Sequence, residues 1–146
     1  MDRFRNVSPQ VYDVEAELAA QGRHILLVED DAQFAQIVKE YLESFDYDVS
    51  IASDGVQGMK RVMEKDFDVI ICDLLMPNLP GDMFYIGVER VKPHLARRFI
   101  FITGHQNNPK VAEFIKKVRA LTLFKPFDMN RLVETIGAAM KNSQKK

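Results

Sequence analysis

Three acidic residues of this sequence directly follow short apolar runs. Glu29 and Asp30 come after residues 25–28, and Asp73 comes after residues 69–72. An uninterrupted apolar run of this length is typical of a parallel strand covered on both faces, and its carboxyl end lies at the edge of the sheet where ligands bind. If the two strands are neighbours, their carboxylates repel one another unless a cation neutralises them. Oxygen ligands without histidine or cysteine suit a hard ion, so the sequence predicts a Mg²⁺ site, which Mn²⁺ could also occupy.

Two hydrogen-bond donors end later apolar runs in the same way. Thr103 follows residues 99–102, and Lys125 follows residues 121–124. A cation, a lysine and a hydroxyl around one carboxylate are what phosphoryl transfer requires, because charge accumulates on the phosphoryl oxygens and catalysis there is mostly positioning and electrostatic stabilisation. Each residue taken singly has an ordinary explanation, such as a cap of the next turn or an exposed lysine. Their joint occurrence at successive strand ends favours chemistry.

The elements that must position these residues alternate between strand and helix from residue 24 onward. Apolar runs predict five strands, within residues 25–28, 49–52, 69–72, 99–102 and 121–124. Apolar residues at helical spacing predict a helix after each strand, near residues 34–45, 54–63, 83–91, 109–119 and 128–140. Five such units with short connections require right-handed crossovers and a parallel sheet. The predicted fold class is therefore α/β, a doubly wound three-layer α/β/α sandwich.

The spacing in the first two helices also predicts which side chains share a face. In the first helix, which Asp31 is expected to cap, these are Phe34, Ile37, Val38, Tyr41, Leu42 and Phe45. In the second helix the predicted buried stripe is Val56, Met59, Val62 and Met63.

Length and composition bound the class of protein. With 146 residues, 47% of them hydrophobic and 28% charged, the chain is long enough for one domain with a real core. A formal charge of −1 gives no global attraction to nucleic acid or to a membrane, so neither is expected as a direct partner. No apolar stretch approaches the length of a membrane span, and the N-terminus lacks the apolar core of a signal peptide. The only cysteine, Cys72, is interpreted as a buried small hydrophobe, and a cytoplasmic, reduced setting is expected.

The predicted organisation has three parts: an N-terminal extension over residues 1–22, a domain over 23–141 and a C-terminal tail over 142–146. Within the extension, Ser8 and Pro9 are typical of a helix start, and Gly22 is typical of a helix end. This short acidic helix has a narrow apolar stripe. We interpret it as a linker or docking helix in preference to a dimerisation segment or the tail of an upstream domain.

Residues of about 24–141 resemble the receiver domain of two-component response regulators. The resemblance rests on ILLVEDD at 25–31, DLLMPNLPG at 73–81, FITG at 101–104 and FKPF at 124–127, four motifs in the right order, each at the end of the right strand. It implies a flavodoxin-like sheet with the strand order 2-1-3-4-5. It also implies a phosphorylation-controlled switch in a two-component phosphorelay. Such a switch catalyses its own phosphorylation and slow autodephosphorylation and is not an enzyme in the usual sense.

The resemblance assigns roles to the acidic residues. Asp73 is the implied phosphoacceptor, which takes a phosphoryl group from a sensor histidine kinase or a histidine phosphotransfer protein. Asp30 and Asp73 would bind Mg²⁺ directly. Glu29 would act through water, and the backbone carbonyl of Leu75 would be a further ligand.

The resemblance also implies how the switch would work. Thr103 and Lys125 would contact the phosphoryl oxygens, and the Lys125–Pro126 peptide is expected to be cis. Phosphorylation adds about two negative charges and three acceptor oxygens. Movement of Thr103 and Lys125 toward these oxygens would shift the loops that follow them. The surface of about residues 106–141 is therefore the expected output face for a downstream protein partner, and a homodimer is compatible with it.

The sequence departs from the family pattern three positions before the lysine. Family members usually carry an aromatic residue there, which swings inward as the threonine hydroxyl moves, whereas here the residue is Thr122. Either the switch works through backbone shifts alone, or the output face responds less to phosphorylation. Leu75, Gly104 and His105 lie next to the implied site and are expected to tune the lifetime of the acyl phosphate. His105 could donate to the phosphoryl group, but an ordinary surface-loop histidine is the favoured interpretation.

Two other functions fit parts of the sequence. With Thr122 at the switch position, the fold could serve as an interaction module whose docking is largely independent of phosphorylation. A phosphohydrolase acting on external substrates would need a second acid to protonate the leaving group, but Leu75 stands where an Asp-x-Asp motif would place it. The residues after 141 in this sequence are too few for a DNA-binding module. The chain is therefore expected to be either a stand-alone regulator or the receiver of a longer chain, such as a hybrid histidine kinase.

Overall fold

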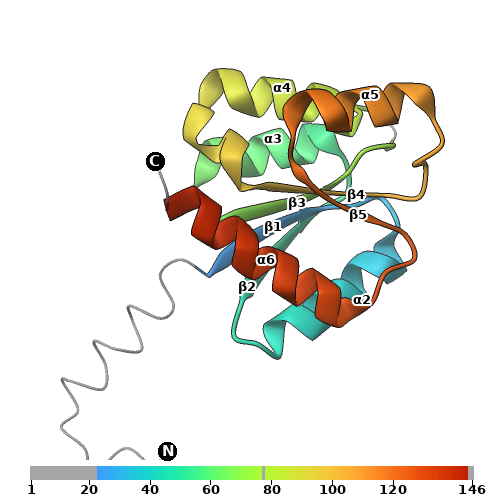
Figure 1. Ribbon diagram of the computed structural model, residues 1–146. Helices are drawn as coiled ribbons and strands as arrows, with labels where there is room; N and C mark the ends of the chain where they lie inside the picture. Colours follow the sequence, from blue (N-terminus) through green and yellow to red (C-terminus); the bar gives the residue numbers. More distant parts are fainter. Residues whose placement is uncertain (1–22, 77, 145–146) are drawn as a thin grey trace, which may run out of the picture.

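The computed structural model describes residues 23–76 and 78–144, in which strands and helices alternate (Figure 1). The strands are β1 (His24–Val28), β2 (Asp48–Ala52), β3 (Val69–Asp73), β4 (Phe99–Thr103) and β5 (Leu121–Phe124). The helices are α2 (Ala32–Glu43), α3 (Gly55–Glu64), α4 (Gly81–Val91), the 3₁₀ helix η2 (Pro93–Arg98), α5 (Pro109–Val118) and α6 (Met129–Gln144). The helix predicted within residues 1–22 lies outside the described residues.

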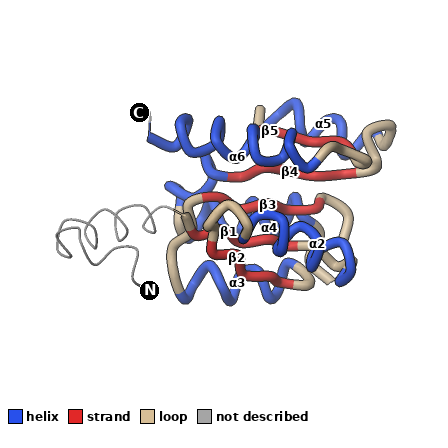
Figure 2. Tube along the Cα trace, turned by 90° about the horizontal axis from the view of Figure 1, so that it is seen from below, coloured by secondary structure: helices blue, strands red, loops and turns tan. Residues whose placement is uncertain are grey.

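The five strands form one parallel sheet in the order β2-β1-β3-β4-β5, which confirms the predicted fold class (Figure 2). Helices α2 and α6 cover one face of the sheet, and α3, α4 and α5 cover the other (Figure 1). In the register of β1 and β3, Val28 pairs with Cys72, so the next residues, Glu29 and Asp73, are level at the carboxyl edge. Topology and register together bring the predicted site residues to one place.

The two faces of the sheet have chemically different cores. The core under α2 and α6 is largely aliphatic, with Ile25, Leu27, Leu42, Ile71, Ile100, Leu132 and Ile136 fully or almost fully buried. The core under α4 and α5 is rich in aromatic rings. There the ring of Tyr85 lies 5.0 Å from that of Phe99 and 5.7 Å from those of Phe101 and Phe114, measured between centroids. These contacts are edge-to-face, the arrangement that aromatic pairs favour.

The buried face of α3 differs from the predicted one. Val56 and Met63 were expected to be buried, but they are 49% and 61% exposed. Val62 is buried as predicted and Met59 is half-buried, but the inward face also includes Gly58, which was not predicted. The reason is that glycine lets the helix approach its neighbours closely, since a Cβ added at Gly58 would lie 2.9 Å from the Phe84 ring.

Helix α2 shows the same kind of difference on a smaller scale. Asp31 caps it as predicted, because its side chain accepts a hydrogen bond from the backbone N–H of Phe34. Ile37 and Phe45 were predicted on its apolar face, but both are exposed, and Phe45 lies beyond the end of the helix. The inward positions include Ala35, which is too small to stand out in an apolar pattern.

The structure has one helix that was not predicted and one that is longer than predicted. The 3₁₀ helix η2 was not predicted, and α6 continues to Gln144, into the region expected to be a tail. Within the described residues, no helix is both long and apolar enough to span a lipid bilayer.

The close approach at Gly58 predicts a stability effect. Gly58→Ala should lower the free energy of unfolding by about 1–3 kcal/mol, because the new Cβ overlaps the buried Phe84 ring and overpacks the core. Gly137→Ala is the matched control, since a Cβ on that exposed residue of α6 meets nothing within 4 Å and should stabilise the helix by about 0.5–1 kcal/mol. Urea unfolding midpoints measure both changes. Equal effects of the two substitutions would contradict the account of α3.

Candidate functional site

The carboxyl ends of β1, β3 and β5 bring four charged side chains together. Carboxylate oxygens of Glu29, Asp30 and Asp73 lie within 4.8 Å of one another. The Nζ of Lys125 donates to Glu29 Oε1 at 3.0 Å and to Asp73 Oδ2 at 3.2 Å. We call Glu29, Asp30, Asp73 and Lys125 the acidic cup. Glu29 and Asp73 are buried and Asp30 is exposed, so the cup is open to solvent at Asp30.

The electrostatics of the cup are dominated by the burial of Glu29, whose residue is only 1% exposed. Burial raises the pKa of Glu29 from 4.5 to about 7, and the Asp73 carboxylate adds to the increase. The backbone N–H of Asp31 and the Lys125 ammonium oppose it without cancelling it. One lysine therefore does not compensate these buried acids.

Lys125 responds in the opposite direction. Burial alone would lower the pKa of Lys125, but the Asp73 and Glu29 carboxylates outweigh it and raise the pKa above its ordinary value. Lys125 is therefore a permanent cation at neutral pH. Its ammonium is held by two charge-assisted hydrogen bonds, which are stronger than neutral ones.

The donor set of the cup fits a hard divalent cation. Three carboxylates and one ammonium leave an excess of negative charge when all are ionised, and the carboxylate oxygens lie close enough together to be shared by one ion. Carboxylate and carbonyl oxygens are the ligands that Mg²⁺ prefers in proteins.

Thr103 ends β4 beside the cup and is fully buried. Its Oγ1 accepts a hydrogen bond from the backbone N–H of His105 at 3.0 Å, so the hydroxyl proton remains available for donation. The backbone N–H of Lys125 donates to the Thr103 carbonyl oxygen at 2.8 Å. At Gly104, an added Cβ would come no closer than 3.8 Å to Lys125, so the space there does not require glycine.

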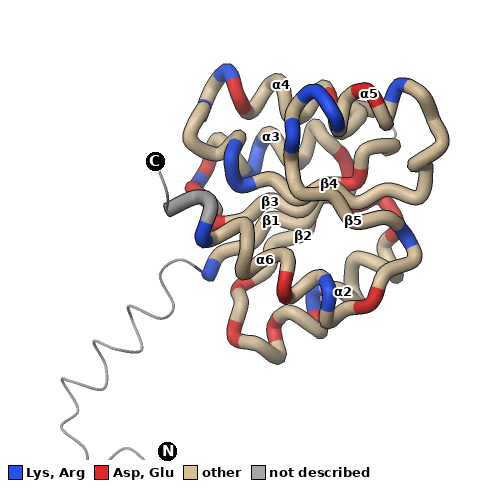
Figure 3. The backbone as a smooth tube through the Cα atoms, in the orientation of Figure 1, with Lys and Arg blue, Asp and Glu red and all other residues tan. Residues whose placement is uncertain are grey.

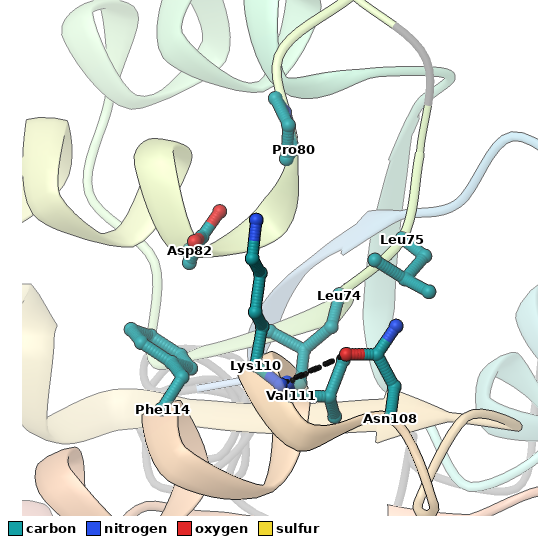
Figure 4. Close-up of a pocket in the computed structure, with 8 residues that line it drawn as sticks. All are labelled: Leu74, Leu75, Pro80, Asp82, Asn108, Lys110, Val111 and Phe114. Carbon is teal, nitrogen blue, oxygen red and sulfur yellow. Dashed lines mark hydrogen bonds between the residues drawn. The ribbon is translucent and has the colours of Figure 1, made fainter.

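The loop after β3 borders the cup on another side. The backbone N–H of Leu75 donates to Asp73 Oδ1 at 3.2 Å, while the Leu75 side chain is 39% exposed. This side chain lines a cavity of about 210 Å³ that separates the loop from α5 (Figure 4). The cavity is mostly apolar, with Phe114 on its far side and the Asn108 amide at the start of α5. The beginning of α5 therefore lies next to open space close to Asp73.

Phe34 of α2 is a site residue that sequence reasoning missed. The Lys125 ammonium lies 4.7 Å from the centroid of the Phe34 ring, close enough for a cation–π interaction. The Phe34 ring also packs edge-to-face with Phe127, at 6.0 Å between centroids. The sequence pattern assigned Phe34 only to the apolar face of a helix. The short distance in sequence between Glu29 and the aromatic Phe34 was the one signal that could have predicted this contact.

Two other predictions concern Thr122 in β5 and the peptide bond that follows this strand. The Lys125–Pro126 peptide is cis, as predicted. Thr122 is half-buried, and its hydroxyl donates to the Ala120 carbonyl oxygen at 3.1 Å, which satisfies it locally. The structure thus brings Glu29, Asp30, Asp73 and Lys125 into direct contact range, with Thr103, Leu75 and His105 in the adjoining loops and strand ends. The hydroxyl of Thr122 is not among the groups brought together at the cup.

The structure thus combines a flavodoxin-like sheet with acids, a lysine and a buried threonine at its carboxyl edge. Comparison with protein families makes this specific, because the response regulator receiver domain matches residues 25–137. The chain belongs to this family, as the resemblance implied. Receiver domains of response regulators bind Mg²⁺ at an acidic pocket and interact with histidine kinases and downstream effectors.

Similar proteins support the assignment. The transcriptional regulatory protein ZraR of Klebsiella oxytoca is 27% identical over 120 residues, which are 82% of this chain and 27% of ZraR, so the chain spans about a quarter of that relative. A receiver domain protein (CheY-like) from Methanospirillum hungatei JF-1 has a TM-score of 0.77 at 23% identity, covering 84% of this chain and 96% of that one. Response regulator TrrA from Thermotoga maritima, in complex with Mg²⁺-BeF, has a TM-score of 0.71 at 20% identity, covering 80% and 98%. At these identities the two structures show the fold alone.

The raised pKa of Glu29 predicts a pH-dependent stability. A carboxyl with a raised pKa binds its proton more tightly in the folded state, so its contribution to stability falls as the pH rises from about 4.5 to about 7. Glu29→Gln mimics the protonated form. In the presence of EDTA, the difference in free energy of unfolding between this variant and the parent should grow by about 2–3 kcal/mol in favour of the variant between pH 5 and pH 8.

Urea denaturation at each pH measures this difference. Glu113→Gln, on the exposed side of α5, removes the same charge and should show no such trend. A difference for Glu29→Gln that does not change with pH would contradict the electrostatic description of the cup.

Proposed function

We propose that this chain is a phosphorylation-controlled signalling switch of a two-component phosphorelay, with Asp73 as the phosphoacceptor. The observation that carries the proposal is the acidic cup, in which the Lys125 ammonium lies 3.2 Å from the buried Asp73 carboxylate. The phosphoryl donor is a sensor histidine kinase or a histidine phosphotransfer protein. Because these donors receive their phosphoryl group from ATP, the proposal places the chain in the cytoplasm. It includes no direct contact with nucleic acid or membrane.

The chemistry is a reversible transfer. An oxygen of Asp73 attacks the phosphorus of phosphohistidine in line, so that an O–P bond forms as the P–N bond breaks. The electron pair stays with the histidine nitrogen, which takes up a proton. Water later hydrolyses the labile acyl phosphate, which releases inorganic phosphate and restores the carboxylate. The chain is therefore modified by its own reaction and does not turn over an external substrate.

Mg²⁺ would be held by Asp30, Asp73 and the backbone carbonyl of Leu75, with Glu29 acting through water. When bound, the ion supplies charge neutralisation for the transferred phosphoryl group. The hydrogen bond from the Leu75 N–H to Asp73 supports this assignment, because it holds the Leu75 backbone beside the carboxylate. Asp30, the exposed member of the cup, lies on the side from which a partner's histidine would approach.

Lys125 and Thr103 would contact the phosphoryl oxygens. Lys125 already bonds to Asp73 and needs only to exchange a carboxylate oxygen for a phosphoryl oxygen. The Thr103 hydroxyl has a proton to donate, because its oxygen acts as the acceptor from His105. His105, Gly104 and the side chain of Leu75 border the path of the hydrolytic water and would set the lifetime of the acyl phosphate.

The output surface is formed by α5, β5 and α6. Thr103 and Lys125 lie directly before the loops that lead into α5 and α6, so movement of these residues is transmitted to both helices. The 210 Å³ cavity beside the start of α5 provides room for such a shift (Figure 4). A downstream protein partner would bind this surface differently in the two states.

A second candidate function rests on Thr122. The side chain at this position cannot act as an aromatic switch, and its hydroxyl is already bonded to Ala120. On this alternative the chain is an interaction module with the receiver fold, and its docking is largely independent of phosphorylation.

Phosphorylation at Asp73 is tested directly. Incubation with Mg²⁺ and acetyl phosphate should give a single phosphoryl adduct in the intact mass spectrum. Asp73→Asn should abolish the adduct, and Lys125→Met should slow its formation roughly 10²-fold, because an electrostatic donor at the phosphoryl group is lost. Asp82→Asn, which removes an acid of α4 outside the cup, should leave the rate unchanged. An adduct that survives Asp73→Asn, or that forms equally well in EDTA, would contradict the proposal.

The response of the output surface separates the two candidate functions. Addition of beryllofluoride with Mg²⁺ should shift backbone amide NMR signals both in the cup and throughout α5, β5 and α6, because the loops after Thr103 and Lys125 move together. Asp73→Asn serves as the control without a phosphoacceptor. If the shifts stay within the cup, the interaction module that ignores phosphorylation is favoured.

A further inference from the structure

A second, larger cavity lies at the opposite edge of the sheet from the acidic cup. Its volume is about 480 Å³, and it is bordered by α4, η2, the end of α5 and the first residues of β4 and β5. We call it the amino-edge cavity, and the residues of its wall that matter here are Tyr85, Glu89, Arg97, Phe99, Val118 and Arg119. No step of the proposed phosphoryl transfer uses it.

Tyr85 presents a hydroxyl group to this cavity from a ring that is otherwise largely buried. The residue is only 9% exposed, and its ring is fixed by edge-to-face contacts with Phe99, Phe101 and Phe114. Its hydroxyl forms no hydrogen bond with any residue that the structure describes and is not closed off from solvent, so a ligand in the cavity can reach it. Burial, and then the nearby Glu89 carboxylate, raise the pKa of Tyr85, so the hydroxyl is a proton donor at neutral pH.

The rim of the cavity carries charges that are not used elsewhere. Arg97 of η2 and Arg119 at the end of α5 line it from two sides, and Glu89 of α4 lines it from a third. Figure 3 shows the basic stretches on η2 and α5. Among the described residues, none of these three side chains forms an ion pair. Two guanidinium groups and one hydroxyl thus offer hydrogen-bond donors, and one carboxylate offers an acceptor.

The rest of the wall is apolar. Phe99 and Val118, with Pro93, Ala96, Ala120 and Leu121, give the cavity surfaces suited to a flat hydrophobic ring. The volume lies in the range of small-molecule sites and well above that needed for a bare anion. Arginine guanidinium groups bind phosphate oxygens in a bidentate manner and stack on aromatic rings.

We propose that the amino-edge cavity binds a nucleoside monophosphate. Arg97, Arg119 and the Tyr85 hydroxyl donate hydrogen bonds to the phosphate oxygens. Glu89 accepts a hydrogen bond from an N–H group of the base, and the apolar wall contacts the flat ring. The site is separate from Asp73 and does not depend on phosphorylation of this chain.

Titration with adenosine 5′-monophosphate, followed by backbone amide NMR, tests the proposal. Saturable shifts are expected for residues lining the cavity on α4, η2 and the α5–β5 connection, with a Kd of about 1 mM or tighter. Tyr85→Phe, which removes only the hydroxyl, should weaken binding about fivefold or more, and Arg97→Gln about tenfold. Tyr41→Phe and Arg90→Gln, which change residues outside the cavity, should not alter the Kd.

Two fragments test the chemistry of recognition. Adenosine lacks the phosphate and inorganic phosphate lacks the ring, so each should bind at least roughly tenfold more weakly than the nucleotide. The titration repeated on Asp73→Asn should give the parent Kd, which separates this proposal from the one for the acidic cup. No saturable shift by about 10 mM, equal binding of inorganic phosphate, or shifts unaffected by Tyr85→Phe and Arg97→Gln together would overturn it.

Discussion

The structure depends on the neutralisation of carboxylates that the sheet forces together. Parallel pairing of β1 with β3 makes Glu29 and Asp73 level at the same edge, and neither can turn to solvent because both are buried. Lys125 reaches them from β5, across the sheet, and bonds to both. Without this lysine the burial of two adjacent acids would be strongly unfavourable. The Phe34 ring, 4.7 Å from the Lys125 ammonium, packs beside this contact from α2.

Lys125 compensates the charge of these acids only in part. Excess negative charge of this kind is what a divalent cation would neutralise, in line with the proposed function. Here burial keeps the pKa of Glu29 raised even with Lys125 in place, so ionising Glu29 at neutral pH costs stability. The fold therefore gives up some stability at the place where the proposed function needs these acids.

Most of the fold and the acidic cup could be predicted from sequence, because both depend on local signals. Apolar runs that end in Asp73 or Lys125 identify a strand and its carboxyl end together, and the parallel sheet then brings the ends to one edge. The buried face of α3 could not be predicted in this way, since Gly58 has no side chain to register in an apolar pattern although it makes the closest approach. The cation–π contact of Phe34 and the amino-edge cavity around Tyr85 were also missed. They arise from packing between elements distant in sequence.

One backbone hydrogen bond joins the ends of β4 and β5. The N–H of Lys125 donates to the carbonyl of Thr103, so the last peptide of β4 and the first peptide beyond β5 are a single mechanical unit. An anion that draws one of these residues toward it changes the geometry of the bond to the other. The two loops that follow Thr103 and Lys125 therefore start from one shared anchor, and a displacement of either strand end reaches both loops.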